Sequence, residues 1–513
     1  MSNIENSNRI AVNTVLLYFR MFISMGVALY TSRIVLNTLG VEDFGIFNVV
    51  GGIVMMFSFL NASMSTATQR FLSFEIGKKN LTQLKKTFSM SINIHIIIAI
   101  VIFILAETIG LWFLNNKLVI PIYRFEAANW VYQCSILSLI VNVIRVPYNS
   151  LIIAHERMKM FAQVSIFEAI LKLAIVLLLI RLQFDKLTLY SLLIFIVTLI
   201  ICFMYWLYCH NNFKKTKYII YWENKLFKTL IAYGGWNLFG GISGVAMQNG
   251  LNILLNLFFG PIVNAARGIS FQVNAAVNGF VSNFQMAMYP QIVKSYAKGD
   301  IKYMHTIIFQ GSKYSFYLLL LITLPILIET ELVLTYWLRM VPEYTVLFCR
   351  LVLINSLIDC ISGPLMTATQ ATGKIRVYQA ILGSLLLLNL PISYIILQNG
   401  FPPETVLFVS IIISIIALFV RLYLVMRLID LSLKGFVINV LLRILVVSST
   451  SILVPVIFRH IMNPNLVQFF VVILVSFLSV LFFAYCFGLN TKEKAFVKNK
   501  VNLLLLRLKG YHF

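Results

Sequence analysis

The chain has 513 residues, of which 60% are hydrophobic and 12% are charged. Soluble domains are about 45–50% apolar and about 25% charged, so a soluble core could not enclose this much apolar surface. The excess is expected to face lipid, which excludes a soluble enzyme or a soluble binding domain. The net charge of +23 is attributed to the basic cytoplasmic loops of a membrane protein rather than to a nucleic-acid-binding surface.

Apolar segments of span length follow one another along almost the whole chain. A bilayer core of about 30 Å takes roughly 20 helical residues. The sequence therefore predicts an all-α, polytopic membrane protein of about fourteen helices. The predicted spans lie near 11–32, 43–66, 87–107, 130–153, 163–181, 187–209, 231–258, 268–291, 312–330, 345–371, 377–398, 403–427, 436–458 and 466–488.

The distribution of Lys and Arg predicts the orientation of these spans. If the N-terminus lies in the cytoplasm, 27 basic residues fall in cytoplasmic segments and 8 in outer segments. Cytoplasmic loops of membrane proteins carry such an excess of basic residues. Both termini are therefore predicted to be cytoplasmic, and the protein to be a multi-pass protein of a bacterial inner membrane.

Two pairs of similar segments predict an internal repeat. Val146–Ala154 resembles Gly363–Ala371 at an offset of 217 residues, and Gly26–Ala28 resembles Gly244–Ala246 at an offset of 218. Six spans per copy is an even number, so the two copies would share one orientation, with a substrate cavity between them. The predicted domains are an N-lobe of helices 1–6 (1–209), a cytoplasmic linker (210–230), a C-lobe of helices 7–12 (231–430), and helices 13–14 with a basic cytoplasmic tail (431–513).

Three basic residues of the N-lobe lie too deep in their spans to reach the headgroups easily. Arg20, Arg145 and Lys172 are eight or nine residues from the cytoplasmic ends of their spans. A charged residue at such a depth costs at least about 2.5–3.5 kcal/mol unless it has a partner, a wet cavity or a function. Lys172 could pair with Glu168, four residues earlier on the same helix face. Arg20 and Arg145 could line a cationic cavity or could be paired with backbone carbonyls.

Polar residues elsewhere in the spans supply further candidates. The predicted eighth span carries Arg267, Gln272 and Asn274 among other polar residues, some of which are expected to face water or substrate. Asp359 could bind or relay a coupling cation, or could form a hydrogen bond between helices. His95 could likewise be an interhelical hydrogen-bonding residue or a proton site. No metal site is predicted, because the six cysteines are scattered and form no CxxC pair.

The chain resembles a known family, the Wzx-type O-antigen and capsule flippases of the multidrug/oligosaccharidyl-lipid/polysaccharide (MOP) exporter superfamily. The resemblance spans essentially the whole chain, although its motifs are loose. The segments that carry it are Thr31–Gly40, Val41–Asn48, Asn264–Gln272, Tyr289–Ala297 and Thr369–Lys374.

The resemblance implies two six-helix lobes that alternate between inward-open and outward-open states. It also implies movement of an undecaprenyl-pyrophosphate-linked oligosaccharide between leaflets, for the synthesis of a surface polysaccharide such as lipopolysaccharide. The candidate pyrophosphate-binding residues are Arg20, Arg33, Arg145, Lys172 and Arg267, with Gln272 and Asn274 nearby in sequence. No cofactor is expected, although H⁺, Na⁺ or the membrane potential could drive transport, with Asp359 and His95 as candidate coupling residues.

Two other functions compete with the flippase. An ion-coupled multidrug-type exporter of small molecules would have the same architecture, but exporters of cationic drugs need acidic residues within their lobes. A membrane polysaccharide polymerase or ligase would need a large outer loop, and the loops here are short. The absence of P-loop, HExxH and GxSxG motifs also indicates a protein that is not an enzyme. Expected partners are the lipid-linked oligosaccharide, membrane lipids, a polysaccharide polymerase and a chain-length regulator, but no nucleic acid.

Overall fold

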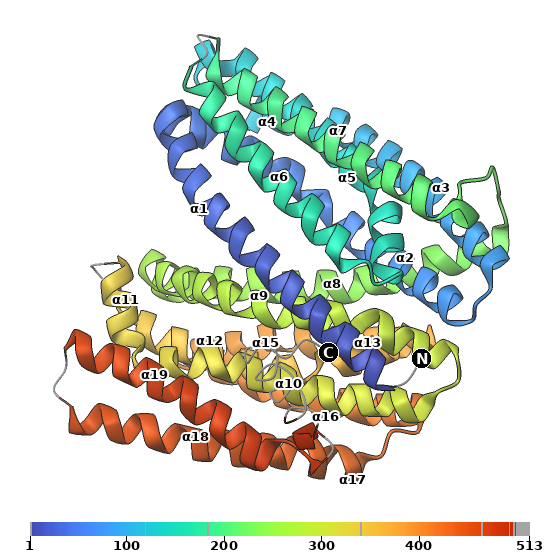
Figure 1. Ribbon diagram of the computed structural model, residues 1–513. Coiled ribbons are helices and arrows are strands. Elements are labelled where there is room, and N and C mark those ends of the chain that lie inside the picture. The colour runs from blue at the N-terminus through green and yellow to red at the C-terminus, as the bar shows by residue number, and fades with distance from the viewer. Residues whose placement is uncertain are drawn as a thin grey trace, which may run out of the picture. The chain divides into compact units, whose positions relative to one another are not determined.

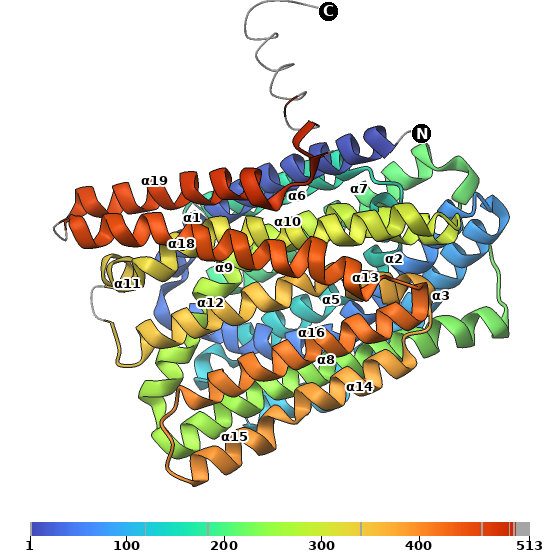
Figure 2. The ribbon, with the colours of Figure 1, turned by 90° about the horizontal axis from the view of Figure 1, so that it is seen from below.

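Every regular element in the part of the chain that the structure describes is helical (Figures 1 and 2). The structure, a computed structural model, describes residues 3–117, 120–181, 184–338, 341–462, 465–491, 493–495 and 498. The predicted fold class, an all-α multi-pass membrane protein, is confirmed. Helices satisfy their own backbone hydrogen bonds, which is why they are the elements that apolar segments of this length form in lipid.

The helices follow the order of the predicted spans. The first half contains α1 (Asn3–Met56), α2 (Ser58–Gly77), α3 (Leu81–Leu105), α4 (Leu111–Lys117), α5 (Phe125–Ala154), α6 (Met158–Leu179) and α7 (Lys186–Asn212). The second half contains α8 (Asn224–Phe259), α9 (Pro261–Ala297), α10 (Ile301–Ile328), α11 (Thr330–Leu338), α12 (Thr345–Ile361), α13 (Gly363–Thr372), α14 (Arg376–Leu387), α15 (Asn389–Gln398) and α16 (Thr405–Ile429). The last helices are α17 (Leu433–Phe436), α18 (Leu442–Ile461) and α19 (Leu466–Phe483).

The number of membrane spans is lower than predicted when it is judged by length and hydropathy. Among the described residues, twelve helical segments are long and apolar enough to cross a membrane. The predicted spans near 43–66 and 268–291 are not among them. The first is divided between the end of α1 and α2, and the second lies in α9, which carries many polar side chains. Both segments are helical, but the count of fourteen is not confirmed.

The positions of the helix ends repeat along the chain, as the sequence similarity predicts. Gly40 interrupts α1 with a φ of 83°, and Gly260 follows α8 with a φ of 75°, 220 residues later. Lys79 and Gly299 form a second left-handed pair at the same offset, after α2 and α9. The backbone bonds also correspond, since Asn80 N donates to Glu75 O and Asp300 N donates to Ser295 O. The two copies therefore share their turns as well as their helices.

The chain forms two compact units. Unit 1 comprises Met1–Val245, Met286–Met304 and Thr367–Ser384, and unit 2 comprises Ala246–Gln285, His305–Met366 and Leu385–Phe513. These units are groups of residues in contact, whereas the predicted lobes are the two copies of the sequence repeat. The units therefore do not test the lobe boundaries, which stay a prediction. Each unit has its own buried core. Leu17, Leu151 and Tyr205 belong to the core of unit 1, and Leu251 and Phe348 to that of unit 2.

A buried ion pair fastens the segment after α19 to α10 within unit 2. Lys313 Nζ lies 2.7 Å from Glu493 Oε2, and both side chains are at most 5% exposed. The Asn490 backbone N–H also donates to Glu493, at 2.7 Å. Burial alone would raise the pKa of Glu493, but Lys313 and this backbone N–H hold it below its ordinary value. The last helices are thereby held to the rest of unit 2.

Removing one member of this pair should destabilise the protein more than removing both. Glu493→Leu alone leaves the Lys313 ammonium buried without a counter-charge, which costs roughly 3–5 kcal/mol. Glu493→Leu combined with Lys313→Met replaces the pair by apolar side chains and should recover most of that loss. Thermal unfolding of the detergent-purified protein measures the effect, with the exposed Lys434 replaced by Met as a control. Equal losses in the single and double variants would contradict this account.

Candidate functional site

Three helices of unit 1 bring four charged side chains together. Glu168 of α6 accepts a hydrogen bond from Lys172 Nζ at 2.7 Å, which confirms the predicted pairing along one helix face. Arg145 of α5 lies 3.6 Å from the other oxygen of the same carboxylate. The sequence shows no acid within four positions of Arg145, because its partner comes from a neighbouring helix. One carboxylate therefore serves two cations.

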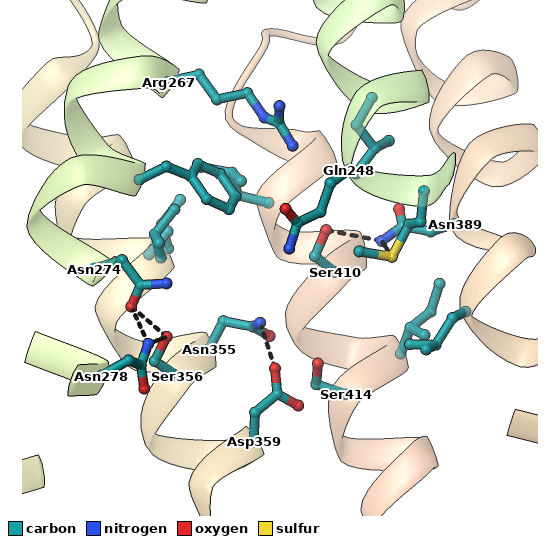
Figure 3. A pocket seen from close by; sticks show the side chains of 18 residues that line it. Gln248, Arg267, Asn274, Asn278, Asn355, Ser356, Asp359, Asn389, Ser410 and Ser414 are labelled. Carbon is teal, nitrogen blue, oxygen red and sulfur yellow. Dashed lines mark hydrogen bonds between the residues drawn. The ribbon is translucent and has the colours of Figure 1, made fainter. Parts of the chain in front are cut away.

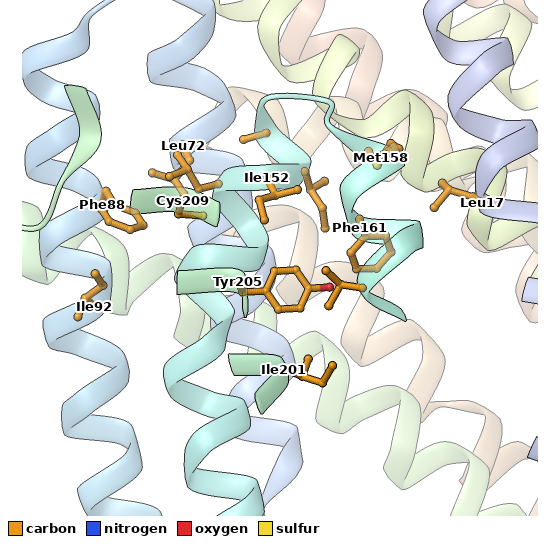
Figure 4. Packing of buried hydrophobic residues seen from close by; sticks show 14 of the residues in the cluster. Leu17, Leu72, Phe88, Ile92, Ile152, Met158, Phe161, Ile201, Tyr205 and Cys209 are labelled. Carbon is orange, nitrogen blue, oxygen red and sulfur yellow. The ribbon is translucent and has the colours of Figure 1, made fainter. Parts of the chain in front are cut away.

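Arg20 of α1 adds a third cation to this region. Its guanidinium carbon lies 4.7 Å from the centre of the Phe161 ring, on α6. Tyr205 of α7 interacts electrostatically with Arg20, and its ring lies 5.7 Å from the guanidinium carbon of Arg145. Figure 4 shows Phe161 and Tyr205 side by side in the core of unit 1, with the Tyr205 hydroxyl directed toward Phe161. An aromatic face stabilises a cation without neutralising it.

We call Arg20, Arg145, Glu168, Lys172 and Tyr205 the basic cluster. Its formal charge is positive, because three cations are balanced by one carboxylate. The four charged side chains are only partly buried, whereas Tyr205 is buried beside them, so the charges of the cluster stay accessible to a ligand. Guanidinium groups match the oxygens of phosphate groups bidentately, and a partly accessible group of this kind can bind an anion.

A polar cavity of about 270 Å³ lies within unit 2 (Figure 3). It is lined by side chains from α8, α9, α12, α15 and α16, together with the end of α14. The predicted residues Arg267, Asn274 and Asp359 all line it. Figure 3 shows Arg267 and Asp359 at opposite ends of the group of labelled side chains. The cavity thus presents a cation and a carboxylate to the same small space.

Arg267 is the cationic end of the cavity. It is 6% exposed, and its guanidinium carbon lies 4.6 Å from the centre of the Phe271 ring, one turn later on α9. Among the described residues no carboxylate lies within ion-pair distance of it, and Arg267 Nε has no hydrogen-bond partner. A buried guanidinium N–H without a partner can donate a hydrogen bond to a ligand in the cavity.

Asp359 is the anionic end of the cavity. Asn355 Nδ2 donates to Asp359 Oδ2 at 3.1 Å, and the Ser414 hydroxyl donates to the same carboxylate from α16. Arg421, also on α16, adds an electrostatic attraction. The carboxylate opens into the cavity, where its free oxygen positions and the neighbouring amide and hydroxyl oxygens could receive a small cation.

Neutral polar groups form the wall between these ends. Asn274 Oδ1 accepts hydrogen bonds from Asn278 at 2.7 Å and from the Ser356 hydroxyl at 2.5 Å. On the opposite wall Asn389 Nδ2 donates to Ser410 Oγ at 2.8 Å. The sequence pattern does not single out Asn389, Ser410 and Gln248, because neutral polar residues in a span carry no charge. Their common property, a position in mid-span, was the available clue.

The remaining predicted residues do not join either site. Gln272 is exposed and is not among the residues that line the cavity. Arg33 lies in α1, but its side chain falls outside the described part of the chain. His95 is fully buried in unit 1, and its Nδ1 donates to the Ser91 carbonyl at 2.7 Å. That acceptor is one turn earlier in α3, so the bond lies within one helix rather than between two.

Solved structures with the same fold are transporters. The chain resembles an outward-facing multidrug resistance MATE family transporter of the MOP superfamily, with a TM-score of 0.71 and 14% identity over 84% of this chain and 98% of that one. It also resembles a MOP superfamily transporter from Pyrococcus furiosus, with a TM-score of 0.70 and 13% identity over 82% and 95% of the two chains. A third is the MATE transporter ClbM in complex with Rb⁺, with a TM-score of 0.68 and 16% identity over 85% and 96%. The fold of this chain is therefore the fold of these transporters.

The family is defined by sequence. The profile of the family described as polysaccharide biosynthesis protein matches residues 10–296, which is more than half of the chain. The chain belongs to this family, and the predicted resemblance to MOP exporters is confirmed. No curated protein matches it. The chain thus combines the sequence of a polysaccharide biosynthesis family with the fold of solved MOP superfamily transporters.

Proposed function

We propose that this protein moves an undecaprenyl-pyrophosphate-linked oligosaccharide from the inner to the outer leaflet of a bacterial inner membrane. The family to which it belongs is described by polysaccharide biosynthesis, which supports a glycan substrate. The distribution of basic residues supports cytoplasmic termini and therefore entry of the substrate from the cytoplasmic leaflet. A polysaccharide polymerase and a chain-length regulator would then act on the product.

The observation that carries this proposal is the excess positive charge of the basic cluster. Arg145 and Lys172 share the Glu168 carboxylate, and Arg20 is stacked on an aromatic ring. Holding this charge at span depth is costly, and an anionic ligand would offset that cost. Pyrophosphate has the required charge and geometry, since its oxygens can accept several charge-assisted hydrogen bonds at once.

A multidrug-type exporter is the second candidate, and the fold of the MATE transporters favours it to some extent. The charges of unit 1 favour the flippase, because a cationic drug would be repelled by a cluster in which three cations are balanced by one carboxylate. The solved Pyrococcus furiosus transporter is described by a reversed polarity of its binding pocket and a different function. A change of pocket charge thus goes with a change of function in that relative.

We further propose that the unit 2 cavity couples transport to a cation. Asp359 is a carboxylate in a membrane-spanning helix, and neutral oxygen-bearing side chains surround it. Hard monovalent cations prefer such oxygen ligands. The ClbM structure was solved with Rb⁺, which shows that a transporter of this fold can hold a monovalent cation. Na⁺ and H⁺ are the candidate coupling ions, and Arg267 would limit occupancy by repelling a second cation.

Replacing Arg20 should strongly slow transport without preventing insertion. Loss of a hydrogen bond to a charged group costs about 1.5–3 kcal/mol, so Arg20→Ala should lower translocation roughly tenfold or more. Vesicles that contain the purified protein and the undecaprenyl-pyrophosphate-linked oligosaccharide measure the rate.

Arg427→Ala is the matched control for this prediction. Arg427 also stacks on an aromatic ring, with 4.6 Å between its guanidinium carbon and the centre of the Tyr423 ring, but it lies outside the basic cluster. This variant should transport normally. An unchanged rate in Arg20→Ala would remove Arg20 from the substrate site.

Replacing Asp359 should abolish the response to an ion gradient. Asp359→Asn keeps the size of the side chain but removes the charge that would attract the cation. Transport in vesicles should then proceed at one rate with or without a Na⁺ or H⁺ gradient, whereas the gradient should accelerate the unmodified protein. Asp430→Asn, a change of an exposed residue after α16, is the control. Retained acceleration in Asp359→Asn would contradict a coupling role.

A further inference from the structure

Unit 1 contains two short segments from the second copy of the repeat. They are the end of α9, within Met286–Met304, and the end of α13 with the start of α14, within Thr367–Ser384. Both segments contact the first copy through buried polar groups. These contacts join the two copies at one end of unit 1, next to the turns that follow α2, α5, α9 and α13.

The first contact is centred on Glu156, in the turn between α5 and α6. Its side chain is 2% exposed and accepts hydrogen bonds from Gln291 at 2.5 Å and from Lys294, both on α9. Arg9 of α1 lies 3.5 Å away. Glu156 itself has a φ of 60°, a left-handed conformation that costs energy for a residue with a Cβ. The carboxylate is thus held in place by groups from both copies.

The second contact is centred on Arg70, near the end of α2. This residue is 5% exposed and donates to the carbonyl oxygens of Gln370 and Ala371, at 3.1 and 2.8 Å. These acceptors end α13, just before Gly373. A Cβ at Gly373 would lie 2.9 Å from Arg70 Nη2, so a side chain there would displace the guanidinium. Rings from Phe71 and Phe74 cover its faces at 4.5 and 4.6 Å.

The two contacts are related by the internal repeat. The end of α2 reaches the turn after α13, and the end of α9 reaches the turn after α5. In each contact, the second helix of one copy thus meets the turn that follows the fourth span of the other copy. Glu156 and Gly373 are equivalent positions, 217 residues apart, and both are left-handed. Gly77 and Ala297 are equivalent ends of α2 and α9, and they touch, since a Cβ at Gly77 would lie 2.7 Å from Ala297 Cβ. Equivalent residues meet only at an axis of local symmetry.

We propose that these contacts form a clasp that closes the cytoplasmic end of the transport path and must open once in each cycle. The clasp consists of Arg9, Arg70, Glu156, Gln291 and Lys294 with the Gln370 and Ala371 carbonyls. This inference rests on the proposed flippase function. Glu156 is a positioning residue that holds the end of α9, which lies against the end of α2, to the turn between α5 and α6, and it does not touch substrate.

The chemistry of the clasp suits a reversible closure. A buried ion pair gains Coulomb energy but loses hydration, so the closed and hydrated states differ little in free energy. A small difference of this kind is what a two-state element requires. His155, beside Glu156, adds no charge at neutral pH, because burial and the nearby Lys294 and Arg157 lower its pKa to about 4. The charge balance of the clasp is therefore set by Glu156 and its cationic partners.

A disulfide across the clasp tests the proposal. In Gly77→Cys combined with Ala297→Cys, oxidation should crosslink α2 to α9 and stop translocation of the undecaprenyl-pyrophosphate-linked oligosaccharide, and a reductant should restore it. The parent protein with its native cysteines controls for oxidation itself. If this pair does not insert, Phe74→Cys with Tyr296→Cys replaces it and is joined by a short, reductant-cleavable thiol crosslinker, because the native rings lie 6.4 Å apart across α2 and α9. Normal transport by the crosslinked protein would overturn the proposal.

The rate of crosslinking tests the role of Glu156 without any substrate. Adding Glu156→Gln should slow crosslinking on the order of tenfold, because Lys294 then lacks its counter-charge. Lys294→Arg keeps the charge and should leave the rate unchanged. Glu223→Gln is the matched control, because that carboxylate accepts from Tyr221 in the linker and lies outside the clasp. Equal rates in Glu156→Gln and Glu223→Gln would overturn the role of Glu156.

These results separate the two proposals. If the reduced protein moves no lipid-linked oligosaccharide, the flippase function fails. The dependence of the crosslinking rate on Glu156 would in that case still decide whether this residue positions the end of α9 against α2.

Discussion

The cost of holding an ionised side chain away from water governs where this protein keeps its charges. Most of its basic residues are predicted to lie in loops on one side of the membrane, and the few at span depth gather at specific places. In unit 1, Glu168 balances two cations and aromatic rings stabilise the excess. In unit 2, Arg267 and Asp359 face one cavity. These charges are therefore concentrated at the basic cluster and at the unit 2 cavity. At both places a bound ligand could offset the cost of holding a charge away from water.

The helical architecture could be predicted from the sequence, because the length of an apolar segment is fixed by the thickness of the bilayer. The repeat was also visible in the similar segments, and the left-handed turns at Gly40 and Gly260 occupy equivalent positions in its two copies. The number of spans was harder to predict. Polar side chains on α9 lower its hydropathy. Neither a count of apolar segments nor a hydropathy threshold therefore decides whether α9 crosses the membrane.

The site was predictable only where one helix carries both partners. The pairing of Glu168 with Lys172 follows from their spacing, but the contact of Arg145 with Glu168 depends on the packing of α5 against α6. The cavity walls in unit 2 illustrate the same limit, because Asn389 and Ser410 meet only after α15 packs against α16. Glu156 and Arg70 lie near helix ends, where the sequence gives no sign of burial, and only the folded chain shows that both are buried.

The central claim is that the substrate is an anionic, lipid-linked glycan rather than a small cationic drug. Deletion of the gene, followed by analysis of surface glycan and of lipid-linked oligosaccharide in each leaflet, tests this claim most directly. The account predicts that surface glycan is lost and that lipid-linked units accumulate in the cytoplasmic leaflet. A normal surface glycan together with a changed tolerance to drugs would contradict it and would favour the exporter.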